Sequence, residues 1–329
     1  MIVNGPETTK RSIRILLSET RGFCAGVVRA IDIVERALET YGPPVYVRHE
    51  IVHNRHVVDS LREKGVIFVK EVNDIPIGAV AVFSAHGVSR RVEDDSKLRE
   101  LHVIDATCPL VKKVHNEAHR YSRQGREIIL IGHNGHPEVE GTMGQIEGTV
   151  FLISTEEEVW QLKPTDPAKL AYVTQTTLSV DDTKEIVAAL KKRFPQIVGP
   201  GASDICYATQ NRQDAVKKLM SKCDLILVIG AQNSSNSNRL REICESNGTR
   251  SLLIPDAGSI DSEWFKGVET VGVTAGASAP EILVQQLVAR LGEMFDATVE
   301  SLAGVSENVV FRLPREFRRK GLDLKEAID

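Results

Sequence analysis

The order of predicted strands and helices constrains the possible folds of this chain most, because the same order occurs three times along the sequence. Short apolar runs that indicate strands, at residues 13–17, 79–83 and 128–131, alternate with segments in which apolar residues recur at helical spacing. Strands that alternate with helices of this length predict βαβ units and parallel sheets. We therefore expect an α/β protein with mostly parallel sheets.

A cysteine marks each of the three copies. Cys24, Cys108 and Cys206 are separated by 84 and 98 residues, and the copies share the order of elements and polar strand ends but almost no residue identity. Cys108 follows a predicted strand, and Pro109 stands where a helix can begin. Right-handed crossovers place the strand ends of one unit on the same side. Three such units facing inward would bring the cysteines and polar ends into one cleft.

We place three pseudo-repeated α/β domains at residues 12–107, 108–204 and 205–313, the last with a C-terminal extension. Residues 1–11 and 315–329 are expected to be tails, and the first of them a disordered lead-in. A chain of 329 residues is too long for one typical core, whereas it suits two or three domains.

Composition excludes several classes of function. A net charge of -4 without a long basic block argues against nucleic-acid binding. The N-terminus lacks the apolar core of a signal peptide, and no apolar run is long enough to span a bilayer, so we expect a cytoplasmic protein without a membrane partner. Five cysteines, an odd and widely spread set, do not form a compact disulfide framework.

Three cysteines without a fourth are typical of a metal centre with an open coordination position. The soft ligand set favours an iron–sulfur cluster or zinc. The alternative is that each is an ordinary core residue, since cysteines are among the most buried side chains. Cys223 and Cys244, at a helix end and inside a helical pattern, are interpreted as core or surface thiols.

Several histidines and small polar residues follow predicted strands in turn-forming or glycine-rich contexts. Their side chains are suited to the oxygens of a phosphate or diphosphate, and two of them, Asn236 and Ser278, lie near predicted helix starts, where anions are favoured. The set comprises His53, His86, His136, Ser234, Ser235, Asn236 and Ser278. The alternatives are satisfied loop histidines and, for N-S-S-N-S-N, a flexible polar loop with a helix cap.

Other motifs are weaker. His115 and His119 are four residues apart on a predicted helix, but the segment is not H-E-x-x-H, so we interpret it as a solvated helix face. G-A-S-A-P around Ser278 resembles a nucleophile elbow that lacks its last glycine and a partnered acid–base pair.

Glu138 is the candidate for handling protons. The segment H-P-E-V-E-G offers Glu138 and Glu140, which would lie on one side of an extended chain. A carboxyl in a closed cleft can have a raised pKa and act as an acid. The alternative for Glu140 is an ordinary charge at a helix N-terminus.

Long motifs across residues 13–313 closely resemble the LytB family of 4-hydroxy-3-methylbut-2-enyl diphosphate reductases. These motifs are R-G-F-C-A-G-V, R-H-E-I-V-H-N, F-S-A-H-G-V, D-A-T-C-P-L-V, I-G-H-N-G-H-P-E-V-E-G-T-M-G-Q, T-Q-T-T-L-S-V-D-D-T, D-I-C-Y-A-T-Q-N-R, N-S-S-N-S-N-R-L and V-T-A-G-A-S-A-P. Only the N-terminal tail and residues 315–329 fall outside the resemblance.

The resemblance implies a trefoil of three α/β domains around a central [4Fe–4S] cluster, held by Cys24, Cys108 and Cys206 with the fourth iron free for the substrate hydroxyl. It implies that Glu138 delivers protons and that Thr176 positions the substrate hydroxyl or a water. It also implies that the diphosphate is bound by His53, His86, His136, Ser234, Ser235, Asn236 and Ser278.

The reaction implied is the last step of the methylerythritol phosphate route to isoprenoids. Two electrons and two protons cleave the C–O bond and yield isopentenyl diphosphate, dimethylallyl diphosphate and water. No flavin or nicotinamide fingerprint is present, so we expect a separate ferredoxin- or flavodoxin-like electron donor. Two alternatives from other classes are a non-redox iron–sulfur dehydratase, which would turn over without reductant, and a cluster-bearing sensor, which would not bind a diphosphate.

Overall fold

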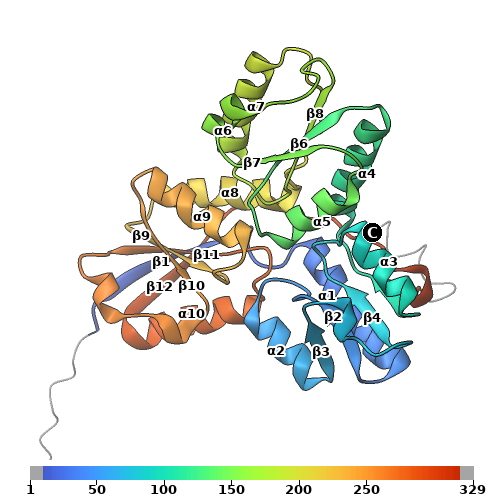
Figure 1. Ribbon diagram of the computed structural model, residues 1–329. Coiled ribbons are helices and arrows are strands. Elements are labelled where there is room, and N and C mark those ends of the chain that lie inside the picture. Colours follow the sequence, from blue (N-terminus) through green and yellow to red (C-terminus); the bar gives the residue numbers. More distant parts are fainter. Residues whose placement is uncertain (1–9, 319–329) are drawn as a thin grey trace, which may run out of the picture. The chain divides into compact units, whose positions relative to one another are not determined.

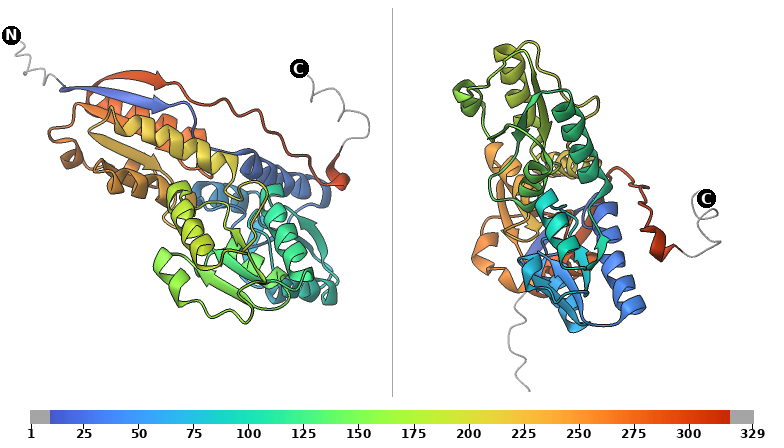
Figure 2. Two further views of the ribbon diagram at one scale, coloured as in Figure 1. Left: turned by 90° about the horizontal axis from the view of Figure 1, so that it is seen from above. Right: turned by 45° about the vertical axis from the view of Figure 1, so that its right-hand side comes forward.

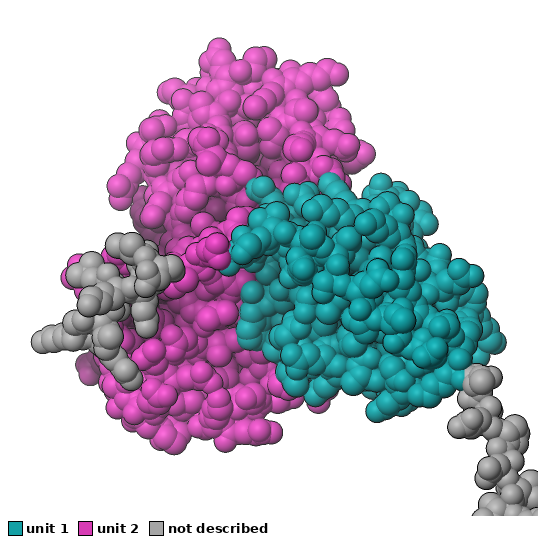
Figure 3. Space-filling model, turned by 180° about the vertical axis from the view of Figure 1, so that it is seen from behind, with its two compact units in different colours: residues 1–23, 210–307 teal, residues 24–209, 308–329 magenta. Residues whose placement is uncertain are grey.

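The computed structural model describes residues 10–318, which fall into two compact units (Figure 3). Unit 1 comprises Met1–Phe23 and Gln210–Glu307, and unit 2 comprises Cys24–Thr209 and Asn308–Asp329. Most of both predicted tails, residues 1–9 and 319–329, lies outside the described residues. Every pairing between the named strands is parallel, which confirms the predicted α/β class.

Unit 1 contains one five-stranded sheet with the strand order β10-β9-β11-β1-β12 (Figure 1). Its strands are β1 (Ser12–Ser18), β9 (Leu225–Ile229), β10 (Arg250–Ile254), β11 (Thr270–Ala275) and β12 (Asp296–Leu302). The helices are α9 (Ser235–Ser246), α10 (Glu281–Met294) and most of α8 (Tyr207–Met220), with short 3₁₀ turns at Ala257–Ser259 and Ser262–Phe265.

Helices cover both faces of this sheet, which explains why its central strands are apolar without alternation. Leu225 and Leu227 pack in one cluster with Leu287 of α10. Ile226 packs on the opposite face with Leu240 of α9. All five residues of β9 are buried.

The first strand belongs to a different sheet from the one we expected. The predicted domain 12–107 began with this strand, but β1 pairs with β11 and β12 in unit 1. An apolar run identifies a strand without identifying its partner, because the pairing is decided by the rest of the chain. Likewise, residues 308–313, predicted in the third domain, cluster with unit 2.

Two segments near the chain ends also differ from the expectation. Arg11 is already structured, because its carbonyl oxygen accepts the N–H of Asp296 at 3.0 Å. Arg315–Phe317 forms a short 3₁₀ turn with Phe317 buried. Strand β12, for which the sequence shows no apolar run, was not predicted, because most of its side chains are exposed at the edge of the sheet.

Unit 2 contains two parallel sheets, with strand orders β3-β2-β4-β5 and β7-β6-β8. The strands are β2 (Val45–Arg48), β3 (Val66–Val69), β4 (Val80–Phe83), β5 (His102–Asp105), β6 (Glu127–Ile131), β7 (Val150–Ile153) and β8 (Leu170–Thr174). The helices are α1 (Ala25–Tyr41), α2 (Arg55–Glu63), α3 (Arg90–Leu98), α4 (Pro109–Arg123), α5 (Pro137–Gln145), α6 (Glu156–Gln161) and α7 (Val180–Arg193), with a 3₁₀ turn at Val72–Asp74.

The three-stranded sheet is covered on both faces (Figures 1 and 2). Ile129 of β6 packs with Ile186 and Leu190 of α7. The next residue along β6, Leu130, faces the other side and packs with Val114 of α4. No helix within residues 10–318 combines the length and the hydropathy needed to cross a bilayer.

Strand register brings the polar strand ends of each sheet to one edge, where open α/β sheets place their ligands. In the four-stranded sheet Phe83 pairs with Asp105. The two segments that follow these strands stay hydrogen-bonded to each other, since the N–H of Cys108 donates to the carbonyl of Ala85 at 2.9 Å. In the three-stranded sheet Thr174 pairs with Ile131.

Candidate functional site

The three predicted metal-binding cysteines all lie in unit 2, at points where helices begin. Cys24 is the N-cap of α1, Cys108 is the N-cap of α4 with Pro109 as its first residue, and Cys206 directly precedes α8. A Cβ atom at Gly26 would lie 2.8 Å from the Cys108 sulfur and 3.7 Å from the Cys24 sulfur. Cys206 interacts electrostatically with both. The structure therefore brings the three cysteines together, although 182 residues separate the first from the last.

Burial dominates the electrostatics of two of these thiols. Burial, together with the neighbouring cysteines, raises the pKa of Cys108 to about 12 and that of Cys206 to about 11. The Cys206 sulfur lies 3.4 Å from the N–H of Thr209 and 3.2 Å from its hydroxyl oxygen. Thiols with such pKa values are neutral at pH 7, so a bound cation would displace their protons.

The donor set fits a cluster better than a single ion. No three His, Cys, Asp or Glu side chains within residues 10–318 are arranged to hold one metal ion. In an iron–sulfur cluster each cysteine binds a different iron, so three sulfurs surround a volume rather than a point. Gly26 leaves room between Cys24 and Cys108 where any other residue would place a side chain.

This space at Gly26 gives a first prediction. In Gly26→Ala, the new methyl group would overlap the Cys108 sulfur, because 2.8 Å is shorter than a normal carbon–sulfur contact. We expect the variant to fold, because Gly26 lies in helix α1, where alanine is favoured over glycine. It should take up far less iron and sulfide during anaerobic reconstitution, as measured by metal analysis. The control is Gly292→Ala on α10, where a Cβ meets no atom within 4 Å; equal iron content in both variants would contradict the prediction.

The three predicted anion-binding histidines form one cluster in unit 2. The rings of His53 and His86 stack with centroids 4.2 Å apart, and His136 approaches their edges at 5.5 and 5.8 Å. They come from three different strand ends, after β2, β4 and β6. Sequence analysis predicted these residues as a set, and the structure confirms that they lie together.

Hydrogen bonds orient two of these rings. Nδ1 of His136 accepts the backbone N–H of Glu138 at 3.1 Å, so the neutral ring carries its proton on Nε2 as a donor. Nδ1 of His86 lies 3.2 Å from the Ser84 hydroxyl. Burial lowers the pKa of His136 to about 3 and that of His86 well below its ordinary value, so both rings are neutral at pH 7.

Glu138 and Thr176 form a buried pair next to the cysteines. The Thr176 N–H donates to Oε1 of Glu138 at 2.6 Å and its hydroxyl donates to Oε2 at 2.8 Å. The carbonyl of Thr176 accepts the N–H of Cys206 at 3.0 Å. Burial raises the pKa of Glu138 to about 7, although the two Thr176 hydrogen bonds oppose this rise. A carboxyl group with this pKa is well suited to donate a proton at neutral pH.

The expectation that Glu138 and Glu140 lie on one side of an extended segment was wrong. Both belong to the first turn of α5, which begins at Pro137. Residues two apart on a helix point in different directions. Glu138 is therefore buried while Glu140 is exposed, and Glu140 is the ordinary helix charge that formed the alternative interpretation.

The remaining predicted anion-binding residues form a separate polar cluster in unit 1, after β9 and β11. The Ser234 hydroxyl lies 3.0 Å from that of Ser237 and 3.5 Å from that of Ser278. Asn236 is 4 % exposed, and neither polar atom of its amide has a hydrogen-bond partner in the described part of the chain. Ser235 is the first residue of α9 and is half-buried.

Sequence reasoning missed Ser237 and Asp204. Ser237 packs against Gly230 and Gly276, where a Cβ would overlap it, so these glycines were the available signal. Asp204 has a fully buried carboxyl that accepts the Thr174 N–H at 3.0 Å. A lone aspartate in a loop carries no sequence signal for such burial.

The prediction that His115 and His119 lie on a solvated face of their helix, α4, was wrong at His115. This ring is buried, burial lowers its pKa to about 4, and Gly87 lies against it. His119 is hydrogen-bonded to Arg90 and Gln145. The two rings are thus packing residues of unit 2 rather than a surface pair.

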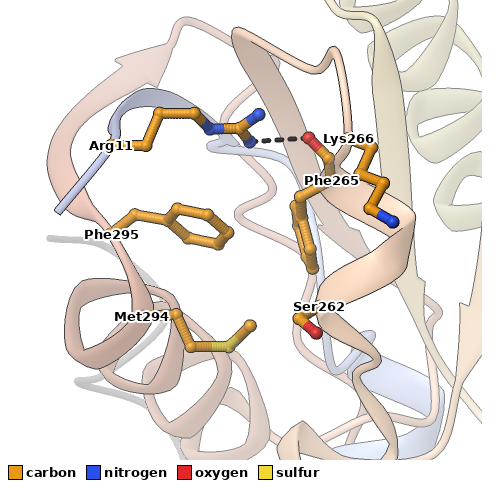
Figure 4. Close-up of a pocket in the computed structure, with 6 residues that line it drawn as sticks. All are labelled: Arg11, Ser262, Phe265, Lys266, Met294 and Phe295. Carbon is orange, nitrogen blue, oxygen red and sulfur yellow. Dashed lines mark hydrogen bonds between the residues drawn. The ribbon is translucent and has the colours of Figure 1, made fainter.

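A cavity of about 290 Å³ in unit 1 does not coincide with any predicted site residue (Figure 4). Its walls are mostly apolar, and the Arg11 guanidinium at its rim donates to the Phe265 carbonyl at 2.6 Å. Cys223 and Cys244, interpreted as core or surface thiols, both pack in the core of unit 1. None of these features adds to the candidate site.

Comparison with known proteins gives a consistent result over nearly the whole chain. The family model described as LytB protein matches residues 15–292. The 4-hydroxy-3-methylbut-2-enyl diphosphate reductase of Bordetella bronchiseptica is 58 % identical over 95 % of this chain and 96 % of its own length. The reductase of that name from Escherichia coli is 56 % identical over 96 % of this chain and 100 % of its own length.

A solved structure is similar as well. The E-1-hydroxy-2-methyl-but-2-enyl-4-diphosphate reductase from Plasmodium falciparum aligns with a TM-score of 0.89 and 39 % identity, over 94 % of this chain and 97 % of that one. The family match covers more than half of the chain, and the identities to these relatives extend across both units. The chain therefore belongs to the LytB family.

Proposed function

We propose that this protein reduces 4-hydroxy-3-methylbut-2-enyl diphosphate to isopentenyl diphosphate and dimethylallyl diphosphate, the terminal step of the methylerythritol phosphate pathway. The observation that carries the proposal is the grouping within unit 2 of three cysteines, a buried acid and a cluster of histidines. Curated relatives that are 56–58 % identical bear the name of this reductase.

The cofactor in this proposal is a [4Fe–4S] cluster held by Cys24, Cys108 and Cys206. When bound, the cluster supplies electrons and a Lewis-acidic iron without a protein ligand. The three-thiol donor set and the side-chain-free space at Gly26 support this assignment. Because burial keeps the Cys108 and Cys206 thiols protonated, loading the site should release protons.

His53, His86 and His136 would bind the diphosphate. Neutral His136 presents its Nε2–H as a donor, since its Nδ1 already accepts a backbone N–H. The family resemblance adds four residues to the diphosphate ligands: Ser234, Ser235, Asn236 and Ser278. The buried, unpartnered amide of Asn236 supports a polar ligand there, because leaving such atoms unsatisfied costs free energy.

Glu138 would donate a proton to the leaving hydroxyl, which departs as water only when it is protonated. Thr176 would hold the Glu138 carboxyl in place and position the substrate hydroxyl or a water. Two electrons must come from outside the chain, and a ferredoxin- or flavodoxin-like protein fits that role. We expect the reaction to take place in the cytoplasm.

The histidine cluster predicts proton uptake upon substrate binding. His86 is neutral in the free protein because burial lowers its pKa. A diphosphate next to it favours the charged ring and raises this pKa, so binding should take up protons and weaken as pH rises. Calorimetry in two buffers of different ionisation enthalpy measures this uptake.

The variant that tests this is His86→Asn, with His56→Asn as control because His56 is exposed on α2. We expect His86→Asn to take up fewer protons and to bind the substrate about tenfold more weakly or worse, in line with the loss of one charge-assisted hydrogen bond. Proton uptake that is equal in both variants would assign the effect to another group.

The experiment that tests the proposed function is iron and acid-labile sulfide analysis of anaerobically purified protein, with a Mössbauer spectrum and a reductase assay. About four of each per chain, one distinct iron site and reductant-dependent turnover are expected. Turnover without any reductant would favour the non-redox dehydratase instead. Zinc, or no metal after attempted reconstitution, would refute the cluster assignment.

A further inference from the structure

Arg29 is a buried cation to which the proposed reaction assigns no role. It lies on α1, five residues after Cys24, and is 9 % exposed. Its Nη1 donates to the carbonyl oxygens of Ala106 at 3.3 Å and Thr107 at 3.1 Å, the two residues before Cys108. One guanidinium thus connects the helix that follows the first cysteine with the loop that ends at the second.

Lys113 makes the equivalent connection to the third cysteine. It lies on α4, the helix whose N-cap is the second cysteine. Its Nζ donates to the carbonyl oxygens of Ala202 and Ser203, both at 3.1 Å, and to Oδ1 of Asp204 at 3.0 Å. These three residues belong to the loop that ends at Cys206.

Two further hydrogen bonds complete the connections around the site. The other carboxylate oxygen of Asp204 accepts the N–H of Thr174, at the end of β8. The Tyr207 hydroxyl accepts the N–H of Ala25 at 3.3 Å, which joins the residue after the third cysteine to the residue after the first. Each pair of cysteines is therefore connected through residues next to them, and each connection lies within unit 2.

These contacts give the two cations a defined role in this part of unit 2. The loops before Cys108 and Cys206 are outside helices and strands, so their carbonyl groups need partners. Each cation satisfies two of these carbonyl groups at once with strong hydrogen bonds. The loop that ends at each of these cysteines is thereby fixed to a helix that begins at another cysteine.

We propose that Arg29 and Lys113 are positioning residues that hold the three cysteines in a cluster-accepting arrangement before any metal binds; this rests on the proposed function. Their removal should leave the fold intact but loosen the cysteines relative to one another. Cluster uptake by the apoprotein should then slow, since three sulfurs must first be brought together.

The test uses the full-length apoprotein, which is reconstituted anaerobically with iron and sulfide while the visible absorption of the cluster is followed over time. We expect Arg29→Met and Lys113→Met each to slow cluster uptake by about 10- to 100-fold, the range typical of residues that orient metal ligands. Their circular dichroism should be unchanged. Lys113→Arg should recover much of the uptake rate, because it keeps a cation that reaches the same carbonyl groups.

Arg36→Met is the matched control. Arg36 lies on the same helix as Arg29 but is partly exposed, and within residues 10–318 its ion pair is with Asp32, four residues earlier. This variant should take up the cluster like the wild type. If Arg29→Met and Lys113→Met match the control, the positioning role is refuted.

Two other outcomes are also decisive. If the wild-type apoprotein takes up no iron and sulfide, the proposed metal centre itself fails, whatever the variants do. If a methionine variant does not fold, Arg29→Lys and Lys113→Arg replace the methionine variants in the test. Slower cluster uptake at an unchanged melting temperature in Arg29→Lys, with recovery in Lys113→Arg, would support the inference, and a wild-type uptake rate in Arg29→Lys would overturn it.

Discussion

Glu138→Gln is expected to bind the substrate normally and to lose most of its turnover, by about 10²- to 10⁴-fold, the usual contribution of a general acid. The amide is nearly isosteric with the carboxyl group, so its oxygen can still accept the Thr176 N–H and its NH₂ can donate to the Thr176 hydroxyl. What the variant loses is the proton. Single-turnover measurement with pre-reduced protein, together with substrate affinity, separates the two effects.

Glu140→Gln is the control, because Glu140 lies in the same helical turn but is exposed. It should retain wild-type turnover. Near-normal turnover of Glu138→Gln would remove Glu138 from the role of proton donor. Loss of both binding and turnover would instead indicate a structural role for the carboxyl.

The pH dependence gives an independent check on Glu138. Burial raises its pKa to about 7, so the protonated, donating form declines as pH rises above that value. The wild-type kcat at saturating substrate, to which the pH dependence of binding does not contribute, should fall on this alkaline side, and the Gln variant should lack the fall. The same raised pKa also affects stability. The free energy of unfolding falls as pH rises from the ordinary carboxyl pKa to about 7, because the carboxyl group ionises in the unfolded chain but not in the folded one, and it stays lower above that pH. At pH 8 the Gln variant should therefore be no less stable than the wild type.

Cys206→Ser is expected to lose the cluster and all activity that depends on it, whereas Cys223→Ser should keep both. Cys206 interacts electrostatically with Cys24, and its N–H donates to the carbonyl of Thr176, while Cys223 packs in the core of unit 1. A serine hydroxyl is a poor ligand for iron in a cluster, because soft thiolates are preferred. Iron and sulfide content per chain and the visible spectrum measure the loss.

Protein stability must be checked in the same experiment, since both thiols are partly buried. Comparing the apoproteins by thermal denaturation shows whether Cys206→Ser folds as the wild type does without metal. An active, cluster-containing Cys206→Ser protein would contradict its assignment as a ligand. Loss of the cluster in Cys223→Ser, with the fold intact, would contradict the interpretation of Cys223 as a core thiol.

Individual helices and strands could be predicted from the sequence where neighbouring residues determine where they begin and end. Pro109 predicted the start of a helix after Cys108, and α4 begins there with Cys108 as its N-cap. Glycine is a common signal for the end of a helix, and Gly42 caps α1 with a positive φ of 74° that favours glycine. The histidines that follow β2, β4 and β6 were predicted as a group, because the strands of one parallel sheet end at one edge and the repeated units were expected to face inward.

The errors arose where contacts between distant parts of the chain determine the local structure. The strand at residues 12–18 pairs with strands more than 250 residues away, and an apolar run contains no information about its partner. Whether Glu138 and Glu140 share a side depended on the start of α5, which Pro137 at the first helical position could have indicated. Burial of His115 depended on Gly87, which lies on another element.

The sequence by itself determined the α/β class, most strand and helix positions, and the residues that form the cluster within each unit, because these follow from local patterning and from motifs typical of the LytB family. Only the tertiary structure decided the distances between those residues and the environments that set their pKa values. Burial brings Glu138 to a pKa of about 7, and the carbonyl contacts of Arg29 and Lys113 connect the cysteine loops. The physical reason is that desolvation and hydrogen bonding between distant segments depend on packing, which no short stretch of sequence encodes.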